Sequence, residues 1–574
     1  MRAPVRNMMA AASLLALTGA SYEPSIIREY NVGVPMRDGT ILSADVVRPG
    51  TDERVPVVLI RTPYGRATER YAEMGNWWAE RGYAFVVQDV RGRGDSGGVF
   101  QPFIDEATDG FDTQSWAGRQ SWSTGKVGTA GGSYLGWTQV YPASLNNPHL
   151  AAMIPAVTAP DPHRNFPLQF GVPMVAAAHW AALVDGRQRQ SFDHVDLASA
   201  YHQLPLIDFD RAIGRRLPLW REWLDHPTYD DYWRAREYQT SLRKSLAPAM
   251  HVSGWYDDVL VGTLQNFAAL STRSPPAGFQ KLVIGPWGHK VNAGRKLGAI
   301  DFGPQAMIDY DNLQKRWFDR WLKGIDNGID REPPVRLFVM GANIWRDEWE
   351  WPLARTVYTR FYLRSSGRAN GSAGDGRLDL KPPGKEPSDR FQYDPANPVP
   401  LITAPDATQV GGPDDYSEVQ KRDDLLVYTT ARLTSQIEVC GPIKVRLYAS
   451  TSARDTDWSA QLQLVRADGY VQRLNDGIVR ARYRRSIAKP EFVKPGSVEP
   501  YDIDLWATCI AVKPGERLRV QIASSAYPKF DRNLNTGGPI ARESRGVIAH
   551  QQIFHDRRRP SHILLPIVPA RAGR

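Results

Sequence analysis

A serine lies in the tight turn that follows a predicted strand. Residues 126–135 read KVGTAGGSYL, a strand-like run that leads into Gly131, Gly132 and Ser133 and is followed directly by helix-compatible sequence. Small residues let the backbone bend tightly at such a strand-to-helix turn, which holds the serine hydroxyl exposed. The usual GxSxG pattern places glycine two residues after the serine, whereas Leu135 stands there in this chain. Ser133 is therefore a candidate nucleophile, and a helix-capping serine on a Gly-rich turn is the alternative.

Two later strand ends supply an acid and a histidine in the order expected for a serine on such a turn, which is serine, then acid, then histidine. The strand-like run 249–254 is followed by Asp257 and Asp258, and the run 281–285 is followed by His289. In this arrangement the histidine takes the serine proton, while Asp257 orients and stabilises the imidazolium. Asp258 is the rival acid.

An acyl-transfer enzyme also needs hydrogen-bond donors for the oxyanion that develops in the transition state. The backbone N–H of Tyr134, just after the candidate nucleophile, is the first such donor. The run 55–60 leads into RTPYG at 61–65, a loop that offers the hydroxyl of Tyr64 as a second donor. From position alone, Tyr64 reads equally well as an aromatic side chain packed beneath a proline turn.

These candidates need a sheet whose strand ends share one edge. The runs 55–60 and 83–90 are almost continuously apolar, as in buried parallel strands, and 71–81 between them has helical spacing. Alternating strands and helices predict a doubly wound α/β sheet. Further strands of this sheet are expected over 126–131, 151–157, 249–254 and 281–285, and a hairpin is expected from 31–36 and 40–47.

Two other regions differ in character from this sheet. Residues 146–245 are rich in Trp, Leu, Arg and Asp at helical spacing, as in 217–224 and 229–238, which predicts an inserted helical cap. After Leu353, polar and apolar residues alternate between Gly, Pro and Asp turns, which predicts a separate antiparallel β domain. The predicted order is a signal peptide at 1–20, the first part of the core at 21–145, the cap at 146–245, the second part of the core at 246–354 and the β domain at 355–574.

Charge and motif content exclude several classes of function. The 574 residues carry 71 Lys and Arg against 62 Asp and Glu, so a formal net charge of +9 is spread along the chain. Such a weak, dispersed charge argues against nucleic-acid binding. The GxGxxG match at 92–97 is followed by Gly98 and Pro102 instead of a helix, which argues against a dinucleotide site. No cluster of His, Cys, Asp and Glu has metal-ligand spacing, so we expect neither a cofactor nor a metal.

The first 20 residues have the order of a secretory signal. Two arginines precede an apolar stretch over 8–17, and small residues follow it. That stretch has about half of the ~20 apolar residues that a membrane-spanning helix needs, and no later segment approaches this length. We expect an exported protein, periplasmic or secreted, without a membrane span. A frayed, alanine-rich terminus of a cytosolic protein is the alternative.

The two cysteines, Cys440 and Cys509, both lie in strand-like runs far from the catalytic candidates. In an oxidising compartment they are able to form a disulfide, but two buried free thiols fit the sequence equally well.

Nine stretches of the chain resemble serine hydrolases of the cocaine esterase type, which are related to Xaa-Pro dipeptidyl peptidases, glutaryl-cephalosporin acylases and α-amino acid ester hydrolases. The stretches are VPMRDG (34–39), RTPYG (61–65), QDVRGRGDSGG (88–98), GGSYLG (131–136), HPTYDDYW (226–233), GWYDD (254–258), GPWGH (285–289), VRLFVMG (335–341) and YPKFDRNLNTGG (527–538). They extend over nearly all of the chain that follows the predicted signal.

The resemblance implies an α/β-hydrolase core, a helical cap inserted before the acid-bearing strand and a C-terminal jelly roll packed against both. It implies a triad of Ser133, Asp257 and His289, with the oxyanion held by the Tyr64 hydroxyl and the Tyr134 N–H. The GxSYxG pattern of the family accounts for the departure from GxSxG. The implied activity is the hydrolysis of a small ester, or an amide in other members, through an acyl-enzyme and without a cofactor. The family often forms homo-oligomers, and the sequence fixes no number.

Substrate contacts follow less directly from the sequence. Acidic residues contact a substrate amine in some members, which makes Asp258 and Asp161 candidates, with turn or helix-start roles as the alternative. Arg66 is a candidate partner for an acyl carboxylate, and a solvated loop arginine is the alternative. A carbohydrate-binding protein with an inactive core is a third class of function, and the complete Ser, Asp and His set argues against it.

Overall fold

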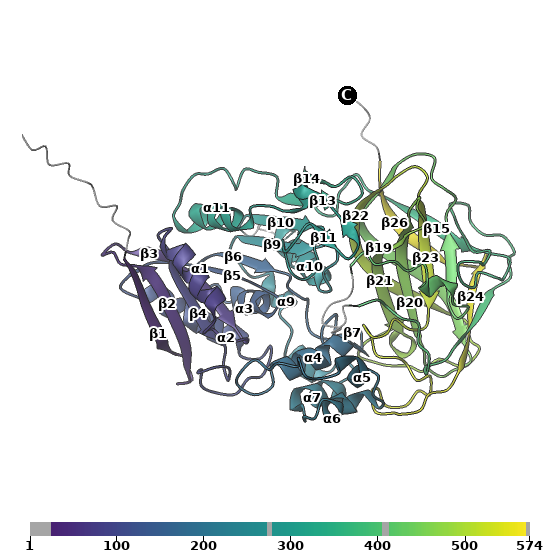
Figure 1. Ribbon diagram of the computed structural model, residues 1–574, viewed down its shortest axis with the longest axis horizontal. Helices are drawn as coiled ribbons and strands as arrows, with labels where there is room; N and C mark the ends of the chain where they lie inside the picture. The colour runs from purple at the N-terminus through teal and green to yellow at the C-terminus, as the bar shows by residue number, and fades with distance from the viewer. Residues whose placement is uncertain (1–24, 273–277, 404–411, 570–574) are drawn as a thin grey trace, which may run out of the picture.

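The computed structural model describes residues 25–272, 278–403 and 412–569. Figure 1 shows an α/β body on the left, a β-rich body on the right and a small group of helices, drawn in blue, below and between them. The predicted signal segment, 1–20, lies outside the described residues. In the described residues, no helix is long and apolar enough to cross a membrane.

The core is one sheet of ten strands in the order β1-β2-β4-β3-β5-β6-β9-β10-β13-β14. Strands β4 through β13 in that order run parallel, while β1, β2 and β14 pair in antiparallel fashion at the edges. The strands are β1 (Ile26–Pro35), β2 (Ile41–Pro49), β3 (Val55–Thr62), β4 (Ala84–Asp89), β5 (Ser123–Gly132), β6 (Leu150–Ala156), β9 (Ala249–Gly254), β10 (Gln280–Gly285), β13 (Val335–Val339) and β14 (Ile344–Glu348). Every expected core strand and the expected hairpin are present, and β13 and β14 extend the sheet.

Helices cover both faces of the central strands, which explains why those strands carry almost continuous apolar runs. Every residue of β3 and of β4 is buried. The helices of the core are α1 (Glu69–Ala79), α2 (Glu106–Arg119), α3 (Tyr134–Ala143), α10 (Leu260–Ser271) and α11 (Tyr310–Leu322). Because parallel strands end at the same edge of a sheet, the loops after β5, β9 and β10 meet there.

The inserted cap lies between β6 and β9. It contains the short pair β7 (Leu168–Gln169) and β8 (Val172–Pro173), and the helices α4 (Val175–Leu183), α5 (Leu197–Tyr201), α6 (Phe209–Ala212), α7 (Pro218–Asp225), α8 (Asp231–Arg234) and α9 (Gln239–Leu242). The insertion begins after Ala156 and not at residue 146, because 150–156 form a strand of the core sheet between β5 and β9. Helix α8 is shorter than the expected 229–238: the Asp230 side chain caps its first turn, and the helix ends at Arg234.

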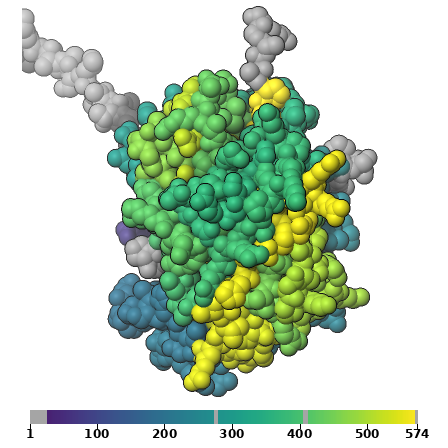
Figure 2. All heavy atoms as spheres, turned by 90° about the vertical axis from the view of Figure 1, so that its right-hand side faces the viewer, coloured from purple at the N-terminus to yellow at the C-terminus, as the bar shows by residue number. Residues whose placement is uncertain are grey.

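The C-terminal domain is the separate, mostly antiparallel β structure that the sequence predicts. Its strands are β15 (Val357–Arg364), β16 (Arg377–Asp379), β17 (Asp389–Tyr393), β18 (Leu426–Thr429), β19 (Ile437–Thr451), β20 (Asp457–Val465), β21 (Val471–Arg480), β22 (Glu499–Val512), β23 (Arg517–Ala523), β24 (Ala549–Asp556), β25 (Arg559–Pro560) and β26 (His562–Val568). The expected irregular loop, 367–387, holds only the short β16. In Figure 2, which faces this jelly roll, the yellow C-terminal part of the chain crosses its front and the blue cap emerges at its lower edge.

Backbone hydrogen bonds join the jelly roll to the core and to the cap. Beyond β13, Met340 donates to Cys509 (3.0 Å) and accepts from Ala511 (2.8 Å), both on β22. On the other side, the N–H of Val175 in the cap donates to the carbonyl of Lys529 (3.1 Å). The jelly roll therefore packs against both of the other parts, as expected.

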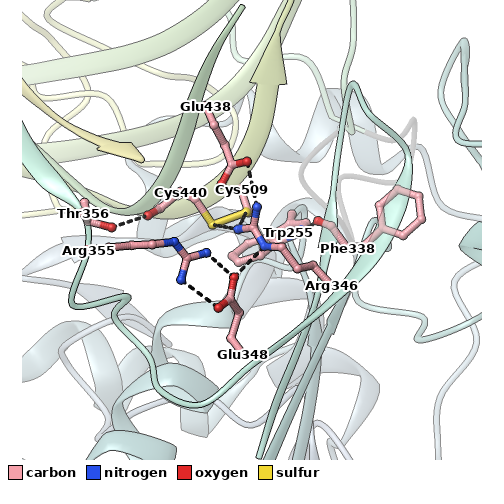
Figure 3. Close-up of a disulfide and its surroundings, with 9 residues drawn as sticks. All are labelled: Trp255, Phe338, Arg346, Glu348, Arg355, Thr356, Glu438, Cys440 and Cys509. Carbon is pink, nitrogen blue, oxygen red and sulfur yellow. Dashed lines mark hydrogen bonds and ion pairs between the residues drawn. A yellow bond between two sulfur atoms is a disulfide. The ribbon is translucent and has the colours of Figure 1, made fainter. Parts of the chain in front are cut away.

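Cys440 and Cys509 form a disulfide across the paired strands β19 and β22, which decides between the two alternatives for these residues (Figure 3). The Arg346 guanidinium from the edge of the core sheet lies 3.6 and 3.7 Å from the two sulfurs. It also pairs with Glu438 at 2.7 Å and with Glu348 at 2.6 Å. The disulfide thus lies at the junction between the core and the jelly roll.

Candidate active site

Ser133 occupies a strained turn between β5 and α3. Its φ is +62°, a conformation that costs a residue other than glycine on the order of 1–3 kcal/mol. The neighbouring glycines make the turn feasible. A Cβ on Gly131 would lie 2.6 Å from the Cβ of Leu135, and one on Gly136 would lie 2.1 Å from the Thr158 hydroxyl. The sequence GGSYLG is therefore explained by close packing around a half-buried serine.

His289 and Asp257 meet at the same edge of the sheet. The His289 Nδ1 atom lies 2.8 Å from Asp257 Oδ1. The carboxylate is fully buried, and it is held from its other side by the Ser253 hydroxyl at 2.6 Å and by the Val259 N–H at 3.2 Å. Between the two rival acids, Asp257 is the one that hydrogen-bonds the histidine.

This hydrogen bond fixes the state of the imidazole. Because the carboxylate accepts, Nδ1 carries the proton, and Nε2 remains as the basic nitrogen. Burial alone would lower the pKa of His289, but the negative charges of Asp257 and Asp258 raise it above its ordinary value. The imidazolium is therefore stabilised at the place where a proton would be received.

Tyr64 lies in the loop after β3, and its hydroxyl accepts a hydrogen bond from the indole N–H of Trp180 in α4 (3.0 Å). The same hydroxyl is in hydrogen-bonding contact with the Ser133 side chain. Burial raises the pKa of Tyr64, although these two contacts offset part of the rise. Since an indole N–H only donates, the phenol proton remains available for a group at the serine.

Trp180 was not anticipated from the sequence. It stands 116 residues after Tyr64 and belongs to the inserted cap, so no spacing rule relates the two. The approach of the cap to the β3 loop is a property of the folded chain.

Tyr134 is the first residue of α3, so its backbone N–H has no acceptor within the helix. Its side chain is buried, and the hydroxyl donates to Glu106 Oε1 at 2.8 Å. Glu106 in turn pairs with the buried Arg61 at 2.8 Å. These contacts fix the residue after the serine, and Glu106 is a second supporting residue that the sequence did not reveal.

The serine and the histidine open onto one large cavity of about 1600 Å³. Among the described residues, its walls come from the core and from the cap. They include Tyr64, Ser133, Trp137, Phe166, Trp180, Asp258 and His289. The described part of the jelly roll supplies none of these walls.

Two of the three substrate-contact candidates are engaged elsewhere. The buried carboxylate of Asp161 accepts the backbone N–H groups of Tyr238 and Gln239 at 2.8 and 2.9 Å, which is its helix-start alternative. The buried Arg66 pairs with the carboxylates of Asp45, Asp89 and Asp95 and is not a solvated loop arginine. Neither belongs to the described walls of the cavity, whereas Asp258 does.

A second group of serine, histidine and aspartate side chains lies in the jelly roll. The Ser365 hydroxyl lies 2.8 Å from both Asp389 oxygens, and His555 Nε2 lies 2.8 Å from Asp389 Oδ2. The Tyr428 hydroxyl donates to the same carboxylate at 2.7 Å. Asp389 and His555 have no exposed surface, so this group has no access to a substrate.

The chain matches two protein-family models. Residues 38–291 match the X-Pro dipeptidyl-peptidase family S15, and residues 327–564 match the C-terminal non-catalytic domain of X-Pro dipeptidyl-peptidases. The second match takes in β13 and β14, which the structure places in the core sheet.

Similar proteins cover almost the whole chain. The cocaine esterase of Rhodococcus sp. (strain MB1 Bresler) is 38% identical over 570 residues, which is 94% of this chain and 98% of that protein. An α-amino acid ester hydrolase superposes with a TM-score of 0.85 at 28% identity, covering 96% of this chain and 98% of the other. An aminopeptidase from a marine sediment Thaumarchaeota archaeon gives 0.85 at 26% identity, covering 98% and 99%.

The similarities agree with the pairing of His289 with Asp257 and with the place of Ser133 on a strand-to-helix turn. The chain belongs to the family of serine hydrolases, esterases and peptidases, that includes cocaine esterase and the X-Pro dipeptidyl-peptidases.

Proposed function

We propose that this protein hydrolyses small acyl esters through an acyl-enzyme formed on Ser133, with His289 as the general base and Asp257 as its partner. The observation that carries the proposal is the 2.8 Å contact between His289 and Asp257 beside a serine that lines the same cavity. No cofactor takes part in this scheme.

In the first half of the reaction, the Ser133 oxygen attacks the ester carbonyl and its proton passes to His289 Nε2. The carbonyl π electrons move to the oxygen and form a tetrahedral oxyanion. When this intermediate collapses, the bond to the alcohol breaks, and the imidazolium gives its proton to the leaving oxygen. Asp257 stabilises the imidazolium during these transfers.

In the second half, water takes the place of the alcohol. His289 accepts a proton from the water, which adds to the acyl carbonyl, and the second tetrahedral intermediate releases the acid while the proton returns to the Ser133 oxygen. Each half begins and ends with a neutral imidazole, so the free enzyme is regenerated.

The oxyanion of both intermediates is assigned to two donors, the Tyr64 hydroxyl and the Tyr134 N–H. The bond from Trp180 supports this assignment, because it occupies an acceptor position of the Tyr64 oxygen and leaves the phenol proton to point at the serine. Loss of one such donor typically costs a factor of about 10²–10³ in kcat.

An amide is the second candidate for the scissile bond. The match to a dipeptidyl-peptidase family and the likeness to an aminopeptidase structure favour it. Comparison of kcat/KM on an ester and on the amide of the same acyl group separates the two, and a clear amide preference would replace the ester proposal.

We also propose that the protein is exported with removal of residues 1–20. The disulfide between Cys440 and Cys509 supports this, because disulfides persist in oxidising compartments. The mass of the exported protein tests the proposal, and a mass that still includes the first 20 residues would contradict it.

Labelling with a fluorophosphonate tests the catalytic proposal. We expect one adduct, mapped to Ser133, in the wild-type protein and in the Ser365→Ala control, but no adduct in Ser133→Ala. The control removes the serine of the buried jelly-roll group and leaves the cavity intact. Full turnover of an activated ester by Ser133→Ala would overturn the assignment.

A further inference from the structure

The GxGxxG match at 92–97 forms a tight turn after β4. Gly92 and Gly94 have φ values of +71° and +52°, which favour glycine, and a Cβ on Gly94 would lie 2.0 Å from Asp89 Oδ2. The glycines therefore serve the turn, and no helix of the described chain opens on them, although a dinucleotide site requires one. Arg93 stands between the two glycines, and its side chain is fully buried.

The Arg93 guanidinium joins the loop of Tyr64 to the inserted cap. Its Nε donates to the carbonyl of Pro63, the residue before Tyr64, at 2.8 Å. Its Nη1 donates to the carbonyl of Val184 at 2.5 Å and also to that of Gly186, both just beyond helix α4. A guanidinium holds its donors in one plane and in fixed directions, so these bonds set the distance between the two segments.

Both ends of this bridge lead to the same hydrogen bond. Pro63 is covalently joined to Tyr64, and the Val184 N–H donates to the carbonyl of Trp180 at 3.1 Å. The Trp180 indole in turn donates to the Tyr64 hydroxyl at 3.0 Å. Arg93 therefore closes a ring of contacts around the hydroxyl that is the proposed oxyanion donor.

An aromatic side chain extends these contacts to the residue of the second donor. The guanidinium carbon of Arg93 lies 5.6 Å from the centre of the Phe100 ring. The Phe100 ring lies 5.8 Å from that of Tyr134 and 6.5 Å from that of Trp180, centre to centre. The Tyr134 and Trp180 rings stack on each other at 5.6 Å. The groups around Arg93 thus lead to both residues assigned to the oxyanion.

Arg93 and Arg66 represent two uses of a buried arginine. Arg66 pairs with three carboxylates, those of Asp45, Asp89 and Asp95, which all belong to the core. The three acceptors of Arg93 are backbone carbonyls, one from the core and two from the cap. Because a backbone carbonyl does not rotate as a side chain does, the contacts of Arg93 fix the relative position of the two segments.

We propose that Arg93 is a positioning residue for the oxyanion site, which holds the Tyr64 loop against the end of the cap helix that carries Trp180, so that the Tyr64 hydroxyl points at the tetrahedral oxygen. The inference rests on the proposed function, in which Tyr64 donates to the oxyanion. Arg93 is not among the described walls of the cavity, so it acts through Tyr64 and does not touch the substrate.

The test is steady-state ester hydrolysis by Arg93→Lys, in the wild-type and in the Tyr64→Phe background. Lysine keeps the charge, but its single nitrogen cannot donate along the directions of both Nε and Nη1. We expect kcat to fall by a factor of about 10 to 10² with KM within about twofold, since a small displacement of a catalytic group has an effect of this size. In Tyr64→Phe the same substitution should change kcat by less than about twofold, because the group through which Arg93 acts is already absent.

Arg187→Lys is the matched control. Arg187 also joins the cap to the turn at 92–97, since its Nε donates to the carbonyl of Gly94 at 3.1 Å and its Nη2 donates to that of Ser96. These bonds do not involve the Tyr64 loop, so we expect the kcat and KM of the wild type. Urea unfolding of both variants measures any loss of stability. A loss of kcat in Arg93→Lys alone then separates positioning from folding.

Arg93→Gln provides the test if the lysine variant does not fold. Glutamine adds no charge that must be buried, and its amide can bond only one of the two segments, so we expect a similar loss of kcat that again requires Tyr64. Full kcat in folded Arg93→Lys or Arg93→Gln, a change in KM alone, or an equal loss of kcat in the Tyr64→Phe background would overturn the inference.

The outcomes also separate this inference from the proposed function. An enzyme whose turnover depends on Ser133 and Tyr64 but ignores Arg93 contradicts the inference alone. Turnover that survives Ser133→Ala contradicts the proposed function. Unchanged kcat in Tyr64→Phe would remove the oxyanion role of Tyr64, and this inference with it.

Discussion

Two groups of serine, histidine and aspartate lie among the described residues, one at a cavity in the core and the other buried in the jelly roll. In the core, His289 bonds Asp257 through Nδ1, while Ser133 stands on a strained turn at the wall of a cavity. In the jelly roll, His555 and Ser365 both bond the same carboxylate, that of Asp389, and the group is buried.

Connectivity and access distinguish the two groups, whereas their residue types do not. A relay needs the serine on one nitrogen of the imidazole and the carboxylate on the other. In the jelly roll, His555 presents the same nitrogen, Nε2, to Ser365 (3.1 Å) and to Asp389 (2.8 Å). Three polar groups converge there on a buried carboxylate, which is the pattern of a structural hydrogen-bond network.

The two histidines should give the largest contrast. His289→Gln removes the base, so we expect kcat to fall by about 10³–10⁴ with the thermal stability largely retained. His555→Gln should leave kcat unchanged and lower the free energy of unfolding by about 1–3 kcal/mol, because a charged partner of Asp389 is lost. Ester turnover and urea unfolding of both variants are the measurements. A loss of turnover in folded His555→Gln would contradict the comparison.

The two tyrosines should differ in the same way, with a smaller effect. Tyr64→Phe loses an oxyanion donor, and we expect kcat to fall by about 10² with little change in KM. Tyr428→Phe loses a hydrogen bond to Asp389, and we expect normal turnover with a loss of stability of about 1–2 kcal/mol. Steady-state kinetics of the matched pair decide the point, since equal turnover in the two variants would remove Tyr64 from the mechanism.

The smallest contrast concerns pH. Burial would lower the pKa of His555, but Asp389 and Glu386 raise it above its ordinary value. The interaction of protonated His555 with Asp389 therefore stabilises the fold fully below pH ~6.5, the ordinary pKa of histidine. This stabilisation is lost as the pH rises through the raised pKa of His555. His289 should have the opposite pH dependence, measured as activity. Because it must be neutral to act as the proposed base, we expect activity to rise with pH.

We expect the difference in unfolding free energy between wild type and His555→Gln to shrink by on the order of 1 kcal/mol between pH 6 and pH 9. Urea unfolding at pH 6 and at pH 9 measures this difference. Tyr428→Phe is the control, because it keeps His555 and loses only the tyrosine hydroxyl. A constant difference would show that His555 remains in one protonation state over this range.

The strand ends of the core were accessible from the sequence for a clear reason. Buried parallel strands carry apolar runs that end where the chain turns, so the residues after 249–254 and 281–285 stand out. Both runs are strands, and their ends bring Asp257 and His289 together. The tight turn at Ser133 could be predicted because glycines flank the serine on both sides.

Contacts between residues that are far apart in the sequence could not be predicted from it. Arg66 reads as a loop arginine because its partners, Asp45, Asp89 and Asp95, come from separate segments. The cysteines are 69 residues apart, and their pairing depends on the register of two strands, which the spacing of the cysteines does not specify.

The backbone bonds between Met340 and β22 have a consequence for how the molecule comes apart. Directly after β13, Met340 forms an isolated parallel bridge with Ile510 of β22 in the jelly roll, and Arg346 contacts the disulfide at the same junction. Unfolding of the jelly roll alone would leave the N–H and carbonyl of Met340 without their hydrogen-bond partners at this junction. We therefore expect the residues at this junction between the core and β22 to unfold as one cooperative unit, with the same hydrogen-exchange protection in both domains.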